Sequence, residues 1–250
     1  MSHMILTKKD IYQGNLILVN AKHPVMPDDY KYFMPIDSNY PDVVLAQKAA
    51  TVLTHIIKDT CCANSIVPVS GYRSKIEQER IYLDSSKNNG NDFTRKYVAM
   101  PNHSEHQTGL AIDLGLKKER IDFIRPDFPY EGICAVFRKT APKYGFIQRY
   151  PKGKEAITGI SHEPWHFRYV GYPHSEIMEK YGLTLEEYVD FLRRFPFNQI
   201  HLSFQAQNRQ IDIYYIYLLS GEQKSIPLPD NAFCEVSGNN VDGCIVTEWR

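Results

Sequence analysis

The sequence predicts a mixed α and β protein with a β-rich C-terminal end. Apolar residues repeat at the helical period across residues 42–60. Short apolar runs bounded by polar residues, such as residues 66–70, are typical of strands. After residue 196 the sequence becomes rich in Ile and Tyr, with turn-forming residues between the apolar runs. We therefore expect a main domain over residues 1–196 and a small β-rich appendage, packed on it, over residues 197–250.

The elements of the main domain follow from local patterns. Residues 5–40 carry many Pro, Asn, Asp and Tyr, which predicts short strands and irregular structure. Ser74 and Glu77 form a capping-box pattern, so a helix should begin at Lys75. Gly145 is a typical residue to close a helix. In chain order we expect helix 42–60, strand 66–70, helix 75–83, loop 84–102, strand 110–114, a surface excursion over 116–131, helix 132–144, strand 146–150, turn 151–159, strand 166–170 and a last helix over 184–194.

The appendage should consist of strands. Residues 200–204 and 211–219 are strand-like, and the turn signal Ser237-Gly238-Asn239-Asn240 separates two further short strands. The chain has five cysteines, and this odd number with irregular spacing argues against a disulfide framework. Cys234 and Cys244 could bridge a hairpin, but we expect free thiols in a reducing compartment.

Charge and hydropathy limit the class of protein. Lys+Arg and Asp+Glu both total 29, so the formal charge is zero and the basic surplus of a nucleic-acid binder is missing. The chain has no run of about 18 apolar residues, so we expect no membrane-spanning helix. No apolar signal core follows Met4, which favours a cytoplasmic location.

The first chemical pattern is Ser104-x-His106-x-x-Gly109-x-Ala111-x-Asp113. Small residues at positions 109 and 111 allow close backbone packing, and His nitrogen and Asp oxygen are normal zinc donors. A hydrogen-bonded histidine and a buried aspartate at a strand end would explain this segment equally well.

The second pattern is Glu163-Pro164-Trp165-His166. His166 would complete three zinc ligands with His106 and Asp113, which leaves the open position of a catalytic zinc site. Pro164 forces Glu163 towards extended geometry, so its carboxylate could act as a base beside the metal. Alternatively, Glu163 forms a surface salt bridge and Trp165 serves core packing.

The third pattern is Ser70-Gly71-Tyr72-Arg73-Ser74 with Gln78. Arg73 lies at a strand-to-helix junction, where a guanidinium could stabilise an oxyanion or bind a carboxylate. It could instead form a structural pair with Glu77 or Asp113.

Together the three patterns resemble the VanY and VanXY family of zinc D-alanyl-D-alanine carboxypeptidases and dipeptidases. The resemblance spans roughly residues 40–195 and rests on the segments 70–78, 104–113 and 163–171. It implies the hedgehog and lysostaphin-like peptidase fold, an α+β domain in which an antiparallel sheet with flanking helices holds the metal. It implies one zinc ion on His106, Asp113 and His166, Glu163 as the catalytic base, and Arg73 as the stabiliser of the transition state. Gln78 and Ser104 would contact substrate.

The resemblance also implies the substrates. VanY-like enzymes typically carry a membrane anchor, whereas this chain is similar to the cytoplasmic VanXY type. We therefore expect hydrolysis of D-Ala-D-Ala and of peptidoglycan pentapeptide precursors, which contributes to vancomycin resistance. Two alternatives remain open: another zinc peptidase of the same fold, such as an L,D-carboxypeptidase or endopeptidase, and a non-catalytic zinc-binding module.

Overall fold

The computed structural model describes residues 3–26, 32–206, 209–218, 223–228 and 233–250. The chain forms two compact units, one over residues 19–184 and one that combines residues 1–18 with residues 185–250. This division differs from the expected boundary at residue 196. The N-terminal strand β1 (His3–Leu6) pairs with β10 (Lys224–Pro227), so the first residues belong to the β-rich unit.

The unit of residues 19–184 is built on a four-stranded antiparallel sheet. Its order is β4-β5-β7-β6, and its strands are β4 (Ile66–Ser70), β5 (Ala111–Leu116), β7 (Glu163–Tyr169) and β6 (Phe146–Tyr150). Asp113 of β5 lies directly opposite His166 of β7, and Ile112 lies opposite Phe167. Because side chains alternate between the faces of a strand, Asp113 and His166 share one face while Ile112 and Phe167 share the other.

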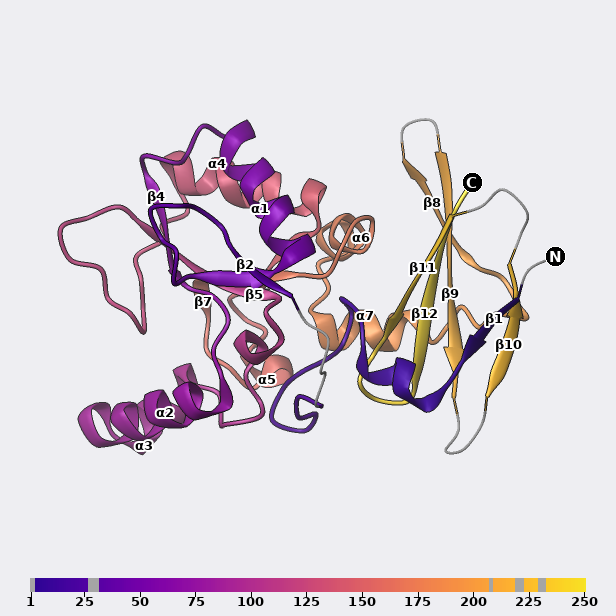
Figure 1. The fold of residues 1–250 in the computed structure, drawn as a ribbon, viewed down its shortest axis with the longest axis horizontal. Helices are drawn as coiled ribbons and strands as arrows, with labels where there is room; N and C mark the ends of the chain where they lie inside the picture. The colour runs from indigo at the N-terminus through magenta and orange to yellow at the C-terminus, as the bar shows by residue number, and fades with distance from the viewer. Residues whose placement is uncertain (1–2, 27–31, 207–208, 219–222, 229–232) are drawn as a thin grey trace. The chain divides into compact units, whose positions relative to one another are not determined.

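The two faces of the sheet have different partners. Phe137 of helix α4 packs edge-on against Phe167, with ring centroids 5.1 Å apart, so one face is apolar core. Figure 1 shows α1 and α4 on one side of the sheet and the pair α2–α3 on the other. The helices are α1 (Gln47–Asp59), α2 (Lys75–Asn89), α3 (Asn91–Tyr97), α4 (Gly132–Thr140), α5 (Glu155–Thr158) and α6 (His174–Tyr181), with 3-10 turns η2 (Glu105–Thr108) and η3 (Ala141–Tyr144).

Most predicted elements of this unit are present, but the structure differs from the expectation in several places. Helix α1 begins at Gln47 rather than residue 42, because Val44–Ala46 forms strand β3, which pairs with β2 (Phe33–Pro35). β-Branched residues such as Val44 suit a strand better than a helix. The predicted loop 84–102 is largely helical: α2 continues to Asn89 and α3 follows.

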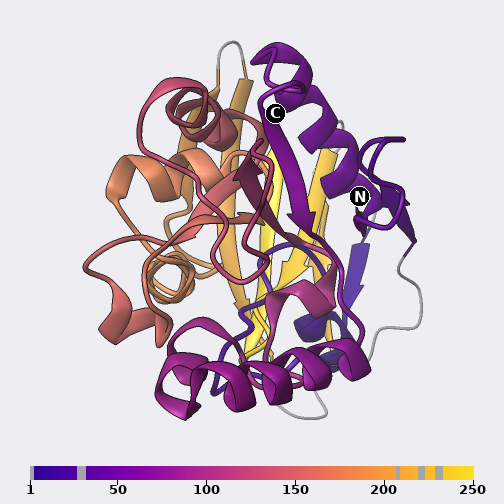
Figure 2. The same cartoon turned by 90° about the vertical axis from the view of Figure 1, so that its left-hand side faces the viewer.

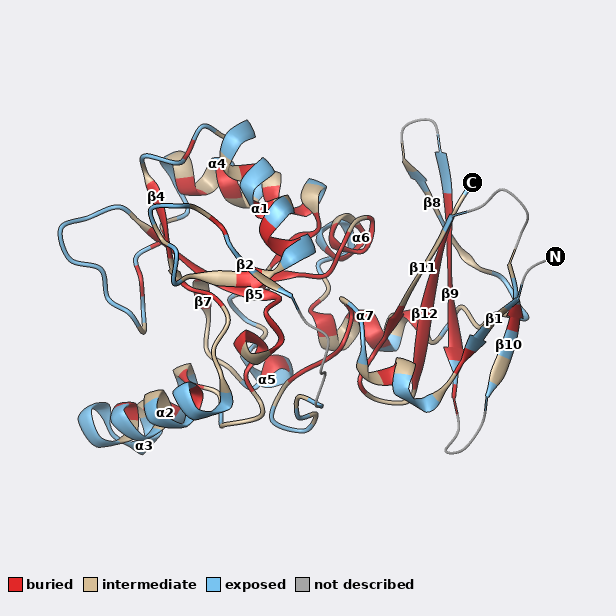
Figure 3. Cartoon of the chain, in the orientation of Figure 1, coloured by how far each residue is buried: buried red, intermediate tan, exposed pale blue. Residues whose placement is uncertain are grey.

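Helices α2 and α3 lie side by side (Figure 2). Ser85 and Thr94 join them through a buried hydroxyl pair 2.8 Å apart. Most other side chains of α2 are exposed or half-buried, so the sequence has little helical periodicity there (Figure 3). The short helices α5 and α6 were not predicted either.

The β-rich unit contains a second antiparallel sheet, in the order β11-β12-β9-β8. Its elements are η1 (Lys8–Tyr12), α7 (Leu185–Leu192), β8 (Leu202–Ala206), β9 (Arg209–Tyr217), β11 (Phe233–Gly238) and β12 (Gly243–Trp249). Leu6 and Ile11 are buried in one cluster with Tyr214, Ile226 and Val246. The expected strand 211–219 corresponds to β9, and residue 219 lies outside the described residues. Of the predicted turn, Ser237 and Gly238 end β11, and Asn239 and Asn240 lie between β11 and β12.

All five cysteines are free, and Cys234 pairs in register with Glu248 rather than with Cys244. Within the described residues, none of the helices has the length and apolar character needed to span a bilayer.

Candidate active site

The sheet and one 3-10 turn bring the predicted metal-binding side chains together. Asp113 and His166 come from neighbouring strands, and His106 comes from η2, which immediately precedes β5. Gly109 ends this turn with φ +69°, and a Cβ there would lie 2.4 Å from a ring carbon of Phe33. A glycine is therefore required at this position in the spacing between His106 and Asp113.

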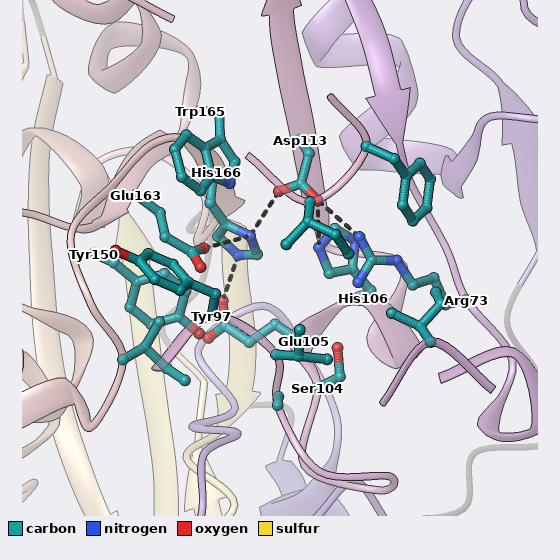
Figure 4. A pocket seen from close by; sticks show the side chains of 16 residues that line it. Arg73, Tyr97, Ser104, Glu105, His106, Asp113, Tyr150, Glu163, Trp165 and His166 are labelled. Carbon is teal, nitrogen blue, oxygen red and sulfur yellow. Dashed lines mark hydrogen bonds and ion pairs between the residues drawn. The ribbon is translucent and has the colours of Figure 1, made fainter. Parts of the chain in front are cut away.

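The three side chains form a buried group whose donor atoms lie within 4.8 Å of one another (Figure 4). His106 Nε2 lies 3.1 Å from Asp113 Oδ2, and His166 Nδ1 lies 2.9 Å from Asp113 Oδ1. Tetrahedral zinc with ligand bonds of about 2.1 Å separates its ligand atoms by about 3.4 Å, so this spacing suits one ion.

The tautomer of His106 also suits a metal. His106 Nδ1 lies 2.7 Å from the carbonyl oxygen of Gly71. A carbonyl only accepts, so Nδ1 carries the proton and Nε2 presents a lone pair towards Asp113. Burial, followed by the charge of Arg73, lowers the pKa of His106 to about 4, which keeps this imidazole neutral. A neutral nitrogen facing a carboxylate oxygen is an arrangement that a cation stabilises.

His166 is held from both ring nitrogens. Its Nδ1 faces Asp113, and its Nε2 lies 3.4 Å from Glu105 Oε2. Burial acts to lower the pKa of His166, but the hydrogen bonds to the two carboxylates outweigh burial and raise it to about 9. Burial would raise the pKa of Asp113, yet the two histidines hold it below its ordinary range.

Glu105 was not among the predicted site residues. It is buried, and its Oε1 accepts hydrogen bonds from Arg149 Nε and Arg168 Nη1, both at 2.8 Å. Burial would raise the pKa of Glu105, but the two guanidinium groups lower it below its ordinary range. The only signals in the sequence were an acid beside His106 and an arginine two residues after His166. Neither reveals that all three charged side chains are buried.

Glu163 is buried at the start of β7 and lines the same pocket. Its Oε2 lies 3.7 Å from His166 Nδ1. Burial raises the pKa of Glu163 to about 8, so this carboxyl can change protonation near neutral pH. The expected alternative, a surface salt bridge, is wrong because the carboxylate is buried. Trp165, for which core packing was the alternative, is buried and also lines the pocket.

Arg73 reaches the group from the loop after β4. Its Nη2 donates to Asp113 Oδ2 at 2.8 Å, and its Nε donates to Ser70 Oγ at 2.8 Å. The guanidinium also lines the pocket. Arg73 therefore makes the expected pair with Asp113 while it faces the space where a substrate would lie.

The two predicted substrate contacts have different positions. Ser104 is buried and lines the pocket. Gln78 is fully buried and is not among the described residues that line this pocket. Its Nε2 donates to the carbonyl of Ala99 at 2.8 Å, and its Oε1 accepts from Arg73 Nη1 at 3.4 Å. Gln78 therefore helps to position Arg73 through this hydrogen bond. Its contact with substrate stays a prediction.

The pocket has a volume of about 40 Å³. Side chains from the sheet form one wall, and Ile81 of α2 and Tyr97 of α3 lie in the opposite wall. Phe123 and Ile124 close it from the predicted surface excursion 116–131. The site thus lies between the polar face of the sheet and the pair α2–α3.

The chain is similar to several known proteins. The VanY family model, described as D-alanyl-D-alanine carboxypeptidase, matches residues 42–172. The bifunctional D-Ala-D-Ala dipeptidase and carboxypeptidase VanXYC of Enterococcus gallinarum is 43% identical over 183 residues, which are 72% of this chain and 95% of that protein.

Two solved structures are similar as well. The D,D-dipeptidase VanXYg, crystallised with a D-Ala-D-Ala phosphinate analog, has a TM-score of 0.97 at 54% identity, and the match covers 100% of this chain and 99% of that one. A VanY variant from a VanB-type resistance cassette, in complex with Zn(II), has a TM-score of 0.56 at 29% identity. The match covers 70% of this chain and 98% of that one. The expected α+β zinc-peptidase fold is confirmed. The chain belongs to the VanY family of D-alanyl-D-alanine carboxypeptidases.

Proposed function

We propose that the protein is a zinc-dependent D,D-peptidase that hydrolyses D-Ala-D-Ala and removes the terminal D-Ala from peptidoglycan pentapeptide precursors. The observation that carries this proposal is the buried group of His106, Asp113 and His166 with Glu163 and Arg73 in one pocket. All five side chains belong to residues 19–184, so we assign catalysis to that unit.

His106 Nε2, an oxygen of Asp113 and His166 Nδ1 would hold one zinc ion. When bound, the ion would supply positive charge for polarising the scissile carbonyl and activating water. Glu163 takes the proton from the attacking water and passes it to the nitrogen of the departing D-Ala. Arg73 donates hydrogen bonds to the oxygen on which negative charge develops. Its present partner, Asp113, would then be shared with zinc.

The proposed substrates connect the enzyme to glycopeptide resistance, because hydrolysis removes the D-Ala-D-Ala ends to which such antibiotics bind. We also propose a cytoplasmic location, where these precursors are made. Free thiols at all five cysteines support a reducing compartment.

The decisive experiment measures release of D-Ala from D-Ala-D-Ala and from the pentapeptide, with and without a zinc chelator. We expect release from both, abolished by chelation and restored by zinc. Dipeptides of L,D and L,L configuration serve as controls that separate an L,D-carboxypeptidase. No release from any peptide by zinc-loaded protein would favour the non-catalytic module. Glu163 and Arg73, which a pure binding module does not need, argue against that alternative.

A further inference from the structure

A second cavity of about 360 Å³ adjoins the catalytic pocket. The two share four wall residues: Val98, Ala99, Tyr150 and Ile160. Tyr150 also contacts His166, with ring centroids 4.9 Å apart. Tyr150 therefore lies in the wall of both cavities and beside a proposed metal ligand.

The two volumes suit different parts of a substrate. The catalytic pocket, at about 40 Å³, is the smaller of the two. The second cavity has the size of a typical site for a larger organic ligand. A D,D-carboxypeptidase releases a single residue, so any longer part of its substrate lies on the amino side of the scissile bond. D-Ala-D-Ala has no such part.

The second cavity combines an apolar wall with positive charge. Tyr82, Val98 and Met100 supply apolar surface. Arg95 of α3 lines the cavity, is exposed, and has no ion-pair partner in the described part of the chain. None of the described residues that line the cavity is Asp or Glu. Such a wall suits a peptide that carries aliphatic groups and a carboxylate.

We propose that this second cavity is the subsite for the carboxylate-bearing peptide on the amino side of the scissile bond, used by the pentapeptide precursor and not by the dipeptide. Arg95 pairs with a carboxylate of that segment. The inference rests on the proposed function and deepens it, because it gives the two substrates different footprints on one catalytic centre.

The first test changes the charge. The probes are D-Ala-D-Ala and Ala-γ-D-Glu-Lys-D-Ala-D-Ala, with a second pentapeptide whose γ-D-Glu carboxylate is amidated. Arg95→Ala should raise KM for the acidic pentapeptide about two- to fivefold, the range of an exposed ion pair. It should leave the dipeptide unchanged, and Arg95→Lys should restore most of the loss. Amidation of the pentapeptide should raise KM of the wild-type enzyme by the same factor and should leave KM of Arg95→Ala unchanged.

The second test fills the space. Ala21 is exposed on a turn and lines the cavity, so Ala21→Trp adds bulk there without touching the catalytic side chains. We expect KM for the pentapeptide to rise by about tenfold or more, with dipeptide hydrolysis intact. The matched control is Arg209→Ala, an exposed arginine that is absent from both walls. Equal effects on both substrates, or none on either, would overturn the proposal.

A binding measurement separates this proposal from the proposed function. Calorimetric titration of zinc-loaded Glu163→Gln protein with each peptide requires no turnover. If wild type cleaves neither peptide, the proposed function fails, and the subsite is still judged by affinity. We expect Ala21→Trp and Arg95→Ala, introduced into this protein, to weaken pentapeptide binding alone. Unchanged pentapeptide affinity in both would refute the subsite.

Discussion

Glu105 and Glu163 are buried carboxyl groups beside the same imidazole, yet their pKa values move in opposite directions. Glu105 accepts hydrogen bonds from Arg149 and Arg168, which lower its pKa despite burial. Burial dominates at Glu163 and raises its pKa to about 8. Glu105 therefore stays ionised to orient His166, while Glu163 can exchange a proton. Such separation of two neighbouring carboxyl groups is typical of acid–base sites.

The roles of Glu163 and His166 predict different mutant phenotypes. Glu163→Ala should retain zinc, because the proposed ligands are intact, and should lower kcat about 10²- to 10⁴-fold, the usual contribution of a general base. His166→Ala should lose both zinc and turnover. Metal content by mass spectrometry and kcat for D-Ala-D-Ala check both variants. Substantial hydrolysis by metal-replete Glu163→Ala would contradict the assignment.

The proton on His166 predicts that zinc binding depends on pH. With its pKa raised to about 9, this imidazole is protonated at neutral pH in the metal-free protein. Zinc has to displace that proton, so zinc affinity should rise by up to about tenfold per pH unit and level off above pH 9. Competition with a chromogenic chelator between pH 6.5 and 9.5 measures this slope. A flat profile would mean that no proton is released from the site.

Glu105→Gln should weaken zinc binding although it replaces none of the proposed ligands. The neutral amide cannot compensate the positive charges of Arg149 and Arg168. Breaking such a buried ion pair costs about 3–5 kcal/mol of folding free energy. Loss of the carboxylate behind His166 should also lower zinc affinity about 10- to 100-fold. Denaturant unfolding and chelator competition measure the two effects. Glu77→Gln, at an exposed capping position, is the matched control. Folded Glu105→Gln with normal zinc affinity would exclude this positioning role.

At the scale of elements, the site depends on how η2 meets β5. Gly109 occupies a left-handed conformation in which a Cβ would lie 2.4 Å from Phe33 and 3.0 Å from the backbone nitrogen of Ala46. Gly109→Ala should therefore destabilise the protein by about 1–3 kcal/mol and lower zinc affinity by displacing His106. Gly182→Ala provides the control, because its φ is +62° and its Cβ would meet nothing within 4 Å. Equal losses of stability and zinc affinity in both variants would show that the positive φ, and not the contact with Phe33, causes the effect.

The elements that the sequence predicted well are those with a local cause. The capping box of Ser74 and Glu77 starts α2 as expected, and the short apolar runs that predicted strands near residues 110–114 and 166–170 correspond to β5 and β7. Helix α3 was missed because it is short and mostly polar and because the surrounding segment 84–102 is Asn-rich, so apolar periodicity is weak there. The role of Glu105 was missed because its arginine partners are 44 and 63 residues away in sequence. Local patterns carry no information about such distant pairs.

At the scale of the whole molecule, the same limit explains the expected boundary at residue 196. Strand β1 pairs with β10 more than 200 residues later, and the backbone of Leu16 donates to Ser237 Oγ at 2.8 Å. No local pattern connects these segments. The division into residues 19–184 and the β-rich unit therefore became visible only in three dimensions.

This division predicts how two truncated chains behave. A chain of residues 1–196 keeps β1 and η1 but loses their partner strands, so Leu6 and Ile11, now 2% and 3% exposed, would face water. A chain of residues 19–184 lacks the whole β-rich unit, both residues 1–18 and residues 185–250. It retains every proposed site residue. We expect the longer chain to bind more hydrophobic dye and to aggregate more, and the shorter one to bind one equivalent of zinc. Dye fluorescence, light scattering and zinc titration compare them. Better behaviour of the 1–196 chain would restore the boundary that the sequence indicated, because it would mean that residues 1–18 are stable without the second sheet.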